Sequence, residues 1–331
     1  MSIPGRPLII GHRGASGYRP EHTAAAYELA FALGADAVEP DIVATRDGVL
    51  VLRHENEISG TTDVASHPEF ADRRATKVID GEEQSGWFTE DFTWDELSTL
   101  RARERLPEVR RGSATFDGLY GILRLSDLMA LIDAQSRRDL VMVAEIKSAT
   151  YFESIGLPLD ELFASEVAGW ATPEKLVVES FEQTVLGQLR GRGVPARYVF
   201  LAEAEGAPAD LTARFGAAAR SYAEHLTSPG LATLASEVDG VSVDKHLLLA
   251  TDAAGNATGA TDLVDRAHAA GLDVFTYTLR AENSFLAKNF WRGSVPHDYG
   301  DWMAEFRMLV GTGVDGVFAD QPDLALAALA D

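Results

Sequence analysis

Side chains able to transfer protons and to bind phosphate lie close together near the start of the chain. His12 and Arg13 follow the apolar residues 7–10, and His54 ends the run V-L-V-L-R-H. Histidine changes its protonation near neutral pH, so a pair of histidines can serve as general acid and general base. A guanidinium beside one of them can hold two oxygens of a phosphate. These residues predict proton-transfer chemistry on a phosphate group.

Three carboxylates form a second group. Glu39 and Asp41 are two residues apart in an apolar run, so on a strand both side chains point to one face. Glu145 lies in the apolar run L-V-M-V-A-E-I, and Lys147 follows two residues later. Neighbouring buried carboxylates repel unless a cation neutralises them, and oxygen ligands without cysteine favour Mg²⁺ or Ca²⁺. The group predicts one divalent cation, and the alternative for Glu39 and Asp41 alone is a salt-bridged surface strand end.

Strand-like apolar runs recur along the chain with helical stretches between most of them. Residues 24–33 read as a helix that Thr23 caps and Gly34 ends, and Ser126 is expected to cap a helix to about Ser136. Further helices are expected at 182–190, 262–270 and 301–310, and strands at 7–10, 37–44, 140–146, 176–178, 198–201, 240–243, 274–278 and 316–318. This pattern predicts an α/β fold of the (β/α)8 TIM-barrel type, whose catalytic residues lie at the C-terminal strand ends.

Two segments depart from the alternation. Residues 49–53 are expected to fold back on 37–44 as a hairpin, which places His54 opposite Glu39. Residues 55–120 contain few apolar core positions, and the capping box that starts at Thr93 predicts a helix through about Arg105. We expect one domain over residues 1–331, with 55–120 inserted over the C-terminal face of the strands, where it sets substrate choice.

Composition narrows the classes of partner. The 331 residues are 46% hydrophobic and carry a formal net charge of -22, which opposes nucleic acid and anionic membranes, so a phosphate-bearing substrate needs a locally positive pocket. The chain contains no cysteine, which excludes disulfides and thiolate metal sites. No apolar run approaches the roughly 18 residues of a membrane span, so stable membrane insertion is not expected. Residues 1–7 lead directly into the first strand, which predicts a cytoplasmic protein, or a secreted one if a leader was removed.

Several motifs occur together and in order. They are H-R-G-A-S-G-Y-R-P-E-H-T, then G-A-D-A-V-E-P-D-I-V-A-T-R-D-G-V-L-V-L-R-H-E, then A-E-I-K, E-S-F and finally G-V-D-G-V-F-A-D-Q-P. Across nearly the whole chain this series strongly resembles the glycerophosphodiester phosphodiesterases, and the long segment after His54 resembles their larger bacterial branch. The resemblance implies a metal-dependent barrel hydrolase of lipid and glycerol metabolism. Its expected substrates are small glycerophosphodiesters, which it cleaves to glycerol 3-phosphate and an alcohol.

The resemblance also implies a role for each residue of the site. His12 and His54 would be the acid/base pair; our own preference is for His54 as the acid. Arg13 and Lys147 would bind phosphate, and one Mg²⁺ or Ca²⁺ would be held by Glu39, Asp41 and Glu145. Phe181 and Tyr277 are candidates to line the pocket. The chain departs from the family pattern at His22, Glu55 and Leu123-Arg124, where Asn, Asp and Pro-Thr are usual; these departures concern substrate preference rather than the reaction.

Three other functions remain open at this stage. A related phospholipase, of the lysophospholipase D or phosphoinositide phospholipase C type, would share both histidines and would need an exposed apolar rim. An amidohydrolase barrel would want H-x-H after the first strand, where this chain has H-R-G. A non-catalytic module that binds glycerophosphoryl groups would be expected to lack a histidine or a ligand, and none is missing.

Overall fold

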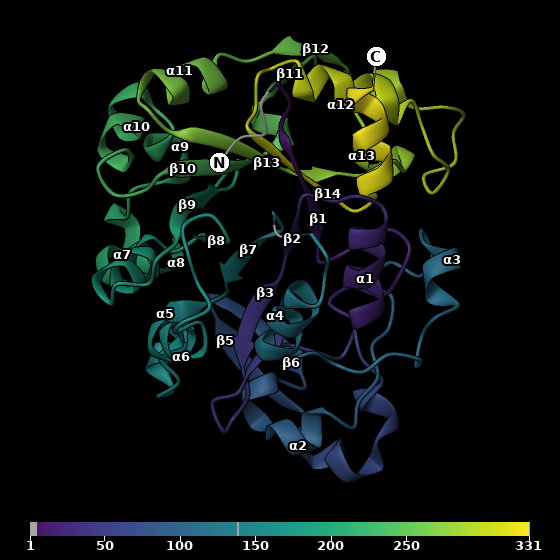
Figure 1. Ribbon diagram of the computed structural model, residues 1–331, viewed down its shortest axis with the longest axis vertical. Coiled ribbons are helices and arrows are strands. Elements are labelled where there is room, and N and C mark those ends of the chain that lie inside the picture. Colours follow the sequence, from purple (N-terminus) through teal and green to yellow (C-terminus); the bar gives the residue numbers. More distant parts are fainter. Residues whose placement is uncertain (1–4, 138, 331) are drawn as a thin grey trace.

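Parallel strands close into an eight-membered ring in the computed structural model, which describes residues 5–137 and 139–330 (Figure 1). Residues 1–4, part of the segment on which the prediction about a leader rests, lie outside the described residues. The ring consists of β1 (Leu8–His12), β2 (Ala37–Glu39) continued by β3 (Asp41–Ala44), β7 (Val141–Ile146), β8 (Leu176–Ser180), β9 (Arg197–Ala202), β10 (Gly240–Asp244), β13 (Asp273–Leu279) and β14 (Gly316–Ala319). β1 pairs with both β2 and β14, and β2 and β3 pair with β7, so the ring is closed. The predicted (β/α)8 TIM barrel is confirmed.

Two apolar layers hold the barrel together. Inside the ring, side chains such as Ile10, Val143, Phe275 and Phe318 pack against one another and are almost fully buried. A larger cluster fills the space between the strands and the surrounding helices. Strands buried on both faces must be apolar at nearly every position, which is why they were readable as continuous runs.

The predicted strand 37–44 is wrong in one respect, because Pro40 divides it. Proline has no backbone N–H to donate to a neighbouring strand. Its carbonyl still accepts a hydrogen bond from the backbone N–H of Glu145 at 2.9 Å. β2 and β3 therefore continue the same position in the barrel while Glu39 and Asp41 lie on either side of the break.

Helices cover the outside of the ring (Figure 1). They are α1 (Ala24–Ala32), α4 (Leu125–Asp133), α5 (Ala149–Ser154), α6 (Leu159–Glu166), α7 (Gln183–Gly191), α8 (Ala209–Phe215), α9 (Tyr222–His225), α10 (Ser228–Leu234), α11 (Leu263–Ala269), α12 (Trp302–Val310) and α13 (Pro322–Leu329). Short 3-10 turns η4 (Gly216–Ala218), η5 (Lys245–Leu247), η6 (Asn283–Phe285) and η7 (Lys288–Phe290), and the hairpin of β11 (Leu249–Thr251) and β12 (Ala257–Ala260), complete this part. Among the described residues, none of the helices combines the length and apolar character that a membrane crossing needs.

The predicted ends of these helices were right for α1 and wrong for α4. Thr23 caps α1, and Gly34 follows it in the left-handed conformation, with φ +92°. α4 begins at Leu125 after the cap residue Arg124, whose backbone N–H is bound by the Asp127 carboxylate, so Ser126 is not the cap. The helix ends at Asp133 instead of Ser136.

The segment after His54 carries its own elements. Before it, β4 (Leu50–Leu52) pairs antiparallel with β3, as predicted for the hairpin. The elements of the segment itself are η1 (Val64–Ser66), η2 (Pro68–Arg73), the hairpin of β5 (Ala75–Ile79) and β6 (Glu82–Gly86), η3 (Thr89–Asp91), α2 (Trp94–Leu97) and α3 (Arg111–Ala114).

The predicted helix from Thr93 to about Arg105 is wrong beyond its first turn. The capping box at Thr93 is present, but α2 ends at Leu97. Arg101 and Ala102 form bridges with Gly121 and Thr62 instead of continuing the helix. Pairing with distant backbone has replaced the local helical hydrogen bonds, which a capping signal does not predict.

Candidate active site

A cavity of about 560 Å³ opens at the C-terminal ends of the barrel strands. The residues predicted for the site lie on β1, β2, β3, β7 and β13, or in the turns that follow β1, β4, β7 and β8. The predicted residues that line it are His12, Arg13, Glu39, His54, Glu145, Lys147, Phe181 and Tyr277. Asp41, the remaining predicted residue, lies directly beneath them and contacts Arg13 and Lys147.

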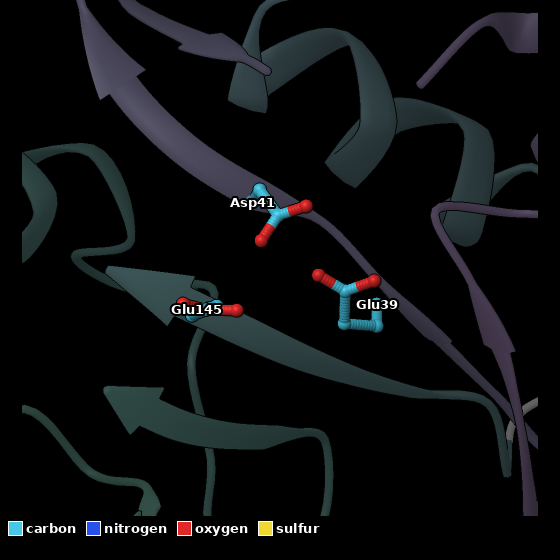
Figure 2. A group of neighbouring side chains, drawn as sticks. All are labelled: Glu39, Asp41 and Glu145. Carbon is cyan, nitrogen blue, oxygen red and sulfur yellow. The ribbon is translucent and has the colours of Figure 1, made fainter. Parts of the chain in front are cut away.

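The three predicted carboxylates converge (Figure 2). Oxygen atoms of Glu39, Asp41 and Glu145 all lie within 4.8 Å of one another, and each side chain is buried. Asp41 and Glu145 are direct neighbours in the pairing of β3 with β7. Glu39 Oε1 and Asp41 Oδ1 have no hydrogen-bond partner among the described residues. Buried oxygens left unpaired at one point, all of them hard donors, suit a small divalent cation.

The protonation of this cluster is strongly perturbed. Burial and the neighbouring charge of Asp41 raise the pKa of Glu39 well above its usual range. Burial likewise raises the pKa of Glu145 to about 8, although Lys147 acts in the opposite direction. Burial would also raise the pKa of Asp41, but the positive charges of Lys147 and Arg13 outweigh it and hold that pKa well below normal. Without a cation, the cluster therefore retains protons that a cation would displace.

Cationic side chains also contact these carboxylates and neutralise part of their charge. Lys147 Nζ lies 2.7 Å from Glu145 Oε1 and 3.6 Å from Asp41 Oδ1. Arg13 Nε lies 3.1 Å from Asp41 Oδ2, and the backbone N–H of Arg13 donates to Glu39 Oε2 at 2.8 Å. The two predicted phosphate-binding residues thus lie at the cavity wall, directly beside the carboxylates.

His12 is held by a partner from the far end of the chain. Its Nδ1 lies 2.6 Å from Asp320 Oδ1, just after β14, which pairs with β1. The other oxygen of Asp320 accepts hydrogen bonds from Arg110 at 2.5 Å and from Arg280 at 2.7 Å. Because Nδ1 is engaged, Nε2 is the ring nitrogen left for exchange of a proton in the cavity.

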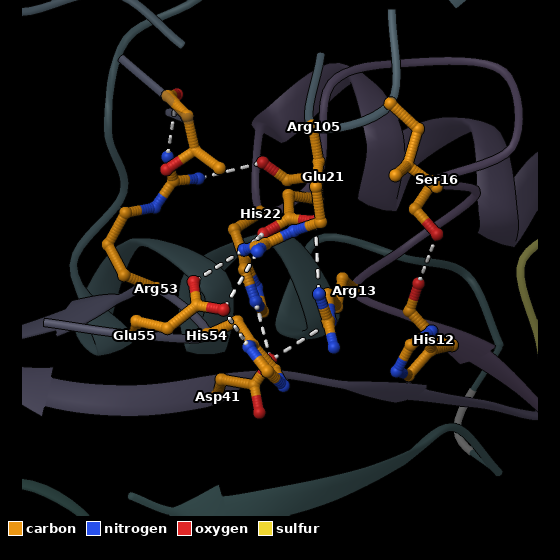
Figure 3. A network of polar contacts seen from close by, with 12 residues as sticks. His12, Arg13, Ser16, Glu21, His22, Asp41, Arg53, His54, Glu55 and Arg105 are labelled. Carbon is orange, nitrogen blue, oxygen red and sulfur yellow. Dashed lines mark hydrogen bonds and ion pairs between the residues drawn. The ribbon is translucent and has the colours of Figure 1, made fainter. Parts of the chain in front are cut away.

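His54 is held in the same way by its neighbour. Its Nδ1 lies 2.6 Å from Glu55 Oε1, and Arg105 binds both oxygens of Glu55 at 2.8 and 2.7 Å. Arg105 also binds Glu21, which contacts Arg13 at 3.1 Å (Figure 3). One continuous polar network therefore joins His54 to the arginine beside His12.

Both histidines are neutral at pH 7 in this arrangement. Burial and the positive charge of Arg13 lower the pKa of His12 to about 4, although Asp320 opposes the shift. Burial, Arg13 and Lys147 lower the pKa of His54 to about 3. A neutral imidazole is ready to accept a proton. A bound phosphodiester anion would raise both pKa values and help whichever ring must be protonated.

Comparison with known proteins decides the family. The model of the glycerophosphoryl diester phosphodiesterase family matches residues 12–324. The chain belongs to this family. It is therefore an enzyme of the phosphoric diester hydrolase class, and the predicted recognition is confirmed.

Three relatives match nearly the whole chain. Glycerophosphodiester phosphodiesterase GDPD6 of Arabidopsis thaliana is 31% identical over 95% of this chain and 84% of its own. The structure of an Oleispira antarctica phosphodiesterase in complex with its product sn-glycerol-3-phosphate is 19% identical, with a TM-score of 0.63 over 98% of this chain and 97% of that one. A glycerophosphodiester phosphodiesterase from Agrobacterium tumefaciens is 18% identical, with a TM-score of 0.59 over 96% and 99%. At these identities the two structures show the shared fold.

This member of the glycerophosphodiester phosphodiesterase family has His22 where Asn is usual, and that residue lies against the cluster of three carboxylates. His22 is fully buried, and its Nε2 lies 2.9 Å from Asp41 Oδ2. Its other ring nitrogen lies 2.8 Å from the Tyr27 hydroxyl. The substitution thus adds an imidazole that orients a carboxylate of the cluster.

Some residues that line or support the site of this family member were not predicted. Glu179 is paired with Glu145 across β7 and β8, is buried, and lines the cavity. Glu179 and Asp320 stand in the motifs E-S-F and A-D-Q-P, so their motifs were the signal that could have found them. Arg105 and Arg110 reach the site from the segment after His54, and no local pattern marks which of its many arginines do so.

Proposed function

We propose that this protein hydrolyses glycerophosphodiesters to glycerol 3-phosphate and an alcohol, with one divalent cation and the two histidines as the acid/base pair. The observation that carries the proposal is one site, at the wall of a cavity, where three converging carboxylates lie beside two histidines, each anchored through Nδ1 by a carboxylate. The product complex of the Oleispira antarctica phosphodiesterase supports the choice of product.

The three carboxylates and the two cationic side chains have different parts in the reaction. Glu39, Asp41 and Glu145 would hold Mg²⁺ or Ca²⁺, which supplies positive charge to the nonbridging oxygens of the phosphate. Arg13 and Lys147 bind the same oxygens and stabilise the charge that develops on them.

The two histidines complete the proton transfers. His12 takes the proton of the nucleophile, either water or the glycerol hydroxyl of the substrate, and His54 protonates the departing alcohol oxygen. Attack by water gives glycerol 3-phosphate directly, whereas attack by the hydroxyl gives a cyclic glycerophosphate that water then opens to glycerol 3-phosphate. Phe181 and Tyr277, whose ring centroids lie 6.0 Å apart, line the wall of the cavity.

A release assay tests the proposal. Purified protein should release glycerol 3-phosphate from glycerophosphocholine or glycerophosphoethanolamine in the presence of Mg²⁺ or Ca²⁺. Removal of the cation with EDTA should abolish the release, and adding back an excess of either ion should restore it. Release of a phosphorylated alcohol in place of glycerol 3-phosphate would contradict the proposed reaction, as would full activity in EDTA.

The protonation of Glu145 predicts how the cation affects stability at different pH. Its pKa in the folded state is about 8, far above the value of about 4.3 in an unfolded chain. A raised pKa contributes stability that is complete below the unfolded value and is lost as the pH rises through 8. A cation replaces the proton, so the rise in melting temperature caused by Mg²⁺ or Ca²⁺ should be larger at pH 8 than at pH 6.

Differential scanning fluorimetry measures this effect. Glu145→Gln removes the titrating group and one ligand, so in this variant the rise should be small at both pH values. An equal rise at pH 6 and pH 8 in the unmodified protein would contradict competition between proton and cation at this site.

A further inference from the structure

A second cavity, of about 730 Å³, adjoins the first and shares part of its wall. The shared residues are His54, Glu145, Lys147, Phe181 and Glu203. From there the cavity extends between the turn that joins β5 to β6 and the start of α5, α7 and α8. We call this second cavity the outer groove. His12 and Arg13 line only the first cavity, so His54 stands at the junction of the two.

The two cavities differ in charge. Five lysine and arginine side chains line the first cavity, namely Arg13, Arg105, Lys147, Lys245 and Arg280, and they balance its five carboxylates, Glu39, Glu145, Glu179, Glu203 and Asp244. Lys147 is the single lysine or arginine among the described residues that line the outer groove, and it lies at the inner end, paired with Glu145. The acidic residues that line the groove are Glu55, Asp80, Glu82, Glu145, Glu182, Glu203 and Glu205. An anionic phosphate suits the first cavity, and the groove repels further negative charge.

One carboxylate of the groove is buried without a full set of partners. Glu182 is 3% exposed; its Oε2 accepts a hydrogen bond from the backbone N–H of Thr150 at 2.9 Å, while Oε1 has no partner among the described residues. Burial, and to a smaller extent the charge of Asp80, raise the pKa of Glu182 to about 7. A buried acceptor left unpaired in a cavity wall is costly; the N–H of an ammonium group would donate to it, and a trimethylammonium group would compensate its negative charge without a hydrogen bond.

The size and lining of the groove favour an organic cation. In the described part of the chain, only Glu39, Asp41 and Glu145 bring three carboxylates within 4.8 Å, so the acids of the groove do not converge on a metal ion. Tyr151, Phe181 and Tyr222 line the groove beside the carboxylates. Aromatic faces together with dispersed negative charge are the surroundings that substituted ammonium groups prefer.

We propose that the outer groove receives the leaving alcohol and selects alcohols that carry an ammonium or trimethylammonium group. This rests on the proposed hydrolysis of glycerophosphodiesters. The nucleophile forms its bond to phosphorus and gives its proton to His12. The bond from phosphorus to the alcohol oxygen breaks, its electron pair stays on that oxygen, and the oxygen takes a proton from His54. The position of His54 at the junction fits this role as acid.

Asp80 closes the groove from the segment after His54. It stands at the turn between β5 and β6 with φ +52°, and its carboxylate accepts a hydrogen bond from Ser148 at 2.7 Å. Ser148 follows Lys147 on the loop before α5. The hairpin thus reaches the barrel at the place where the cation would lie, which gives this segment a specific means of choosing substrate.

A pair of substrates that differ only in charge tests the inference. Glycerophosphocholine is compared with the ester in which 3,3-dimethylbutanol replaces choline, so that an uncharged carbon stands in place of the positively charged nitrogen. At low salt we expect kcat/KM for the choline ester to exceed that for the dimethylbutyl ester by about tenfold or more. The ratio of the two kcat/KM values should fall as salt is added. In the double variant Glu203→Gln/Glu205→Gln and in Asp80→Asn, the ratio should move towards one.

A control and a second measurement make the result decisive. Glu153→Gln removes an exposed carboxylate of α5 that does not line the groove, and it should keep the ratio of the unmodified protein. Free choline should inhibit more strongly than 3,3-dimethylbutanol, which can be measured without any variant. Equal kcat/KM values for the two esters would overturn the groove assignment while leaving the reaction intact, as would a high ratio that the groove variants do not change. Failure to hydrolyse either ester would instead overturn the proposed function.

Discussion

Replacing His12 or His54 with alanine should lower turnover on glycerophosphocholine by about 10²- to 10⁴-fold. The reaction needs a proton removed from the nucleophile and another delivered to the leaving alkoxide, and each ring presents Nε2 because a carboxylate engages Nδ1. Substrate should still bind, because Arg13 and Lys147 remain. If both rings act in one step, the double variant should be little slower than either single variant.

The leaving group distinguishes the acid from the base. With p-nitrophenol as the leaving alcohol no proton is required, so the variant that lacks the acid should regain much of its rate, and we expect this of His54→Ala. The variant that lacks the base should not recover. His268→Ala is a suitable control because this ring lies on the surface, 2.9 Å from Asp315, and lines neither cavity. Near-normal turnover in both His12→Ala and His54→Ala would show that the assignment is wrong.

Replacing Glu39 with glutamine should reduce both cation affinity and activity by about 10³-fold. The amide keeps the size of the side chain and can still accept the hydrogen bond that the backbone N–H of Arg13 donates to Glu39. It removes the negative charge that the cation requires. Titration of activity with Mg²⁺ and Ca²⁺, together with calorimetry of cation binding, measures the two losses separately.

Glu179→Gln is the matched control for Glu39→Gln. Glu179 is equally buried and lies two strands from Glu39 along the barrel, next to Glu145, but it does not belong to the three carboxylates that converge. Its loss should change cation affinity far less. Normal cation binding by Glu39→Gln, or an equal loss in both variants, would mean that the ion lies elsewhere.

The sequence predicted the barrel because its strands had to be apolar on both faces. Runs such as residues 140–146 stood out against their surroundings, and the polar residues that interrupt or end them marked the site. Short helices such as α5 and α8 were missed, because in six or seven residues an apolar pattern has little room to repeat.

Contacts between distant residues were beyond local pattern reading. The capping box at Thr93 correctly marked where a helix starts, but bridges to residues far along the chain decided where it stops. In the same way Arg105 binds Glu21 across 84 positions, and Arg110 binds Asp320 across 210. Such pairs follow from the closed fold, and no pattern in the neighbouring residues predicts them.

The contact between His12 and Asp320 joins residues 308 positions apart, one on the first strand of the barrel and the other directly after the last. It can form only when β14 closes against β1, which is the longest-range pairing in the ring. Contacts of such sequence separation carry the largest cost of loop closure. During refolding, the return of activity should therefore coincide with the last closure of the barrel and lag behind the return of helical signal. The time course of returning activity therefore reports when the ring closes in this protein.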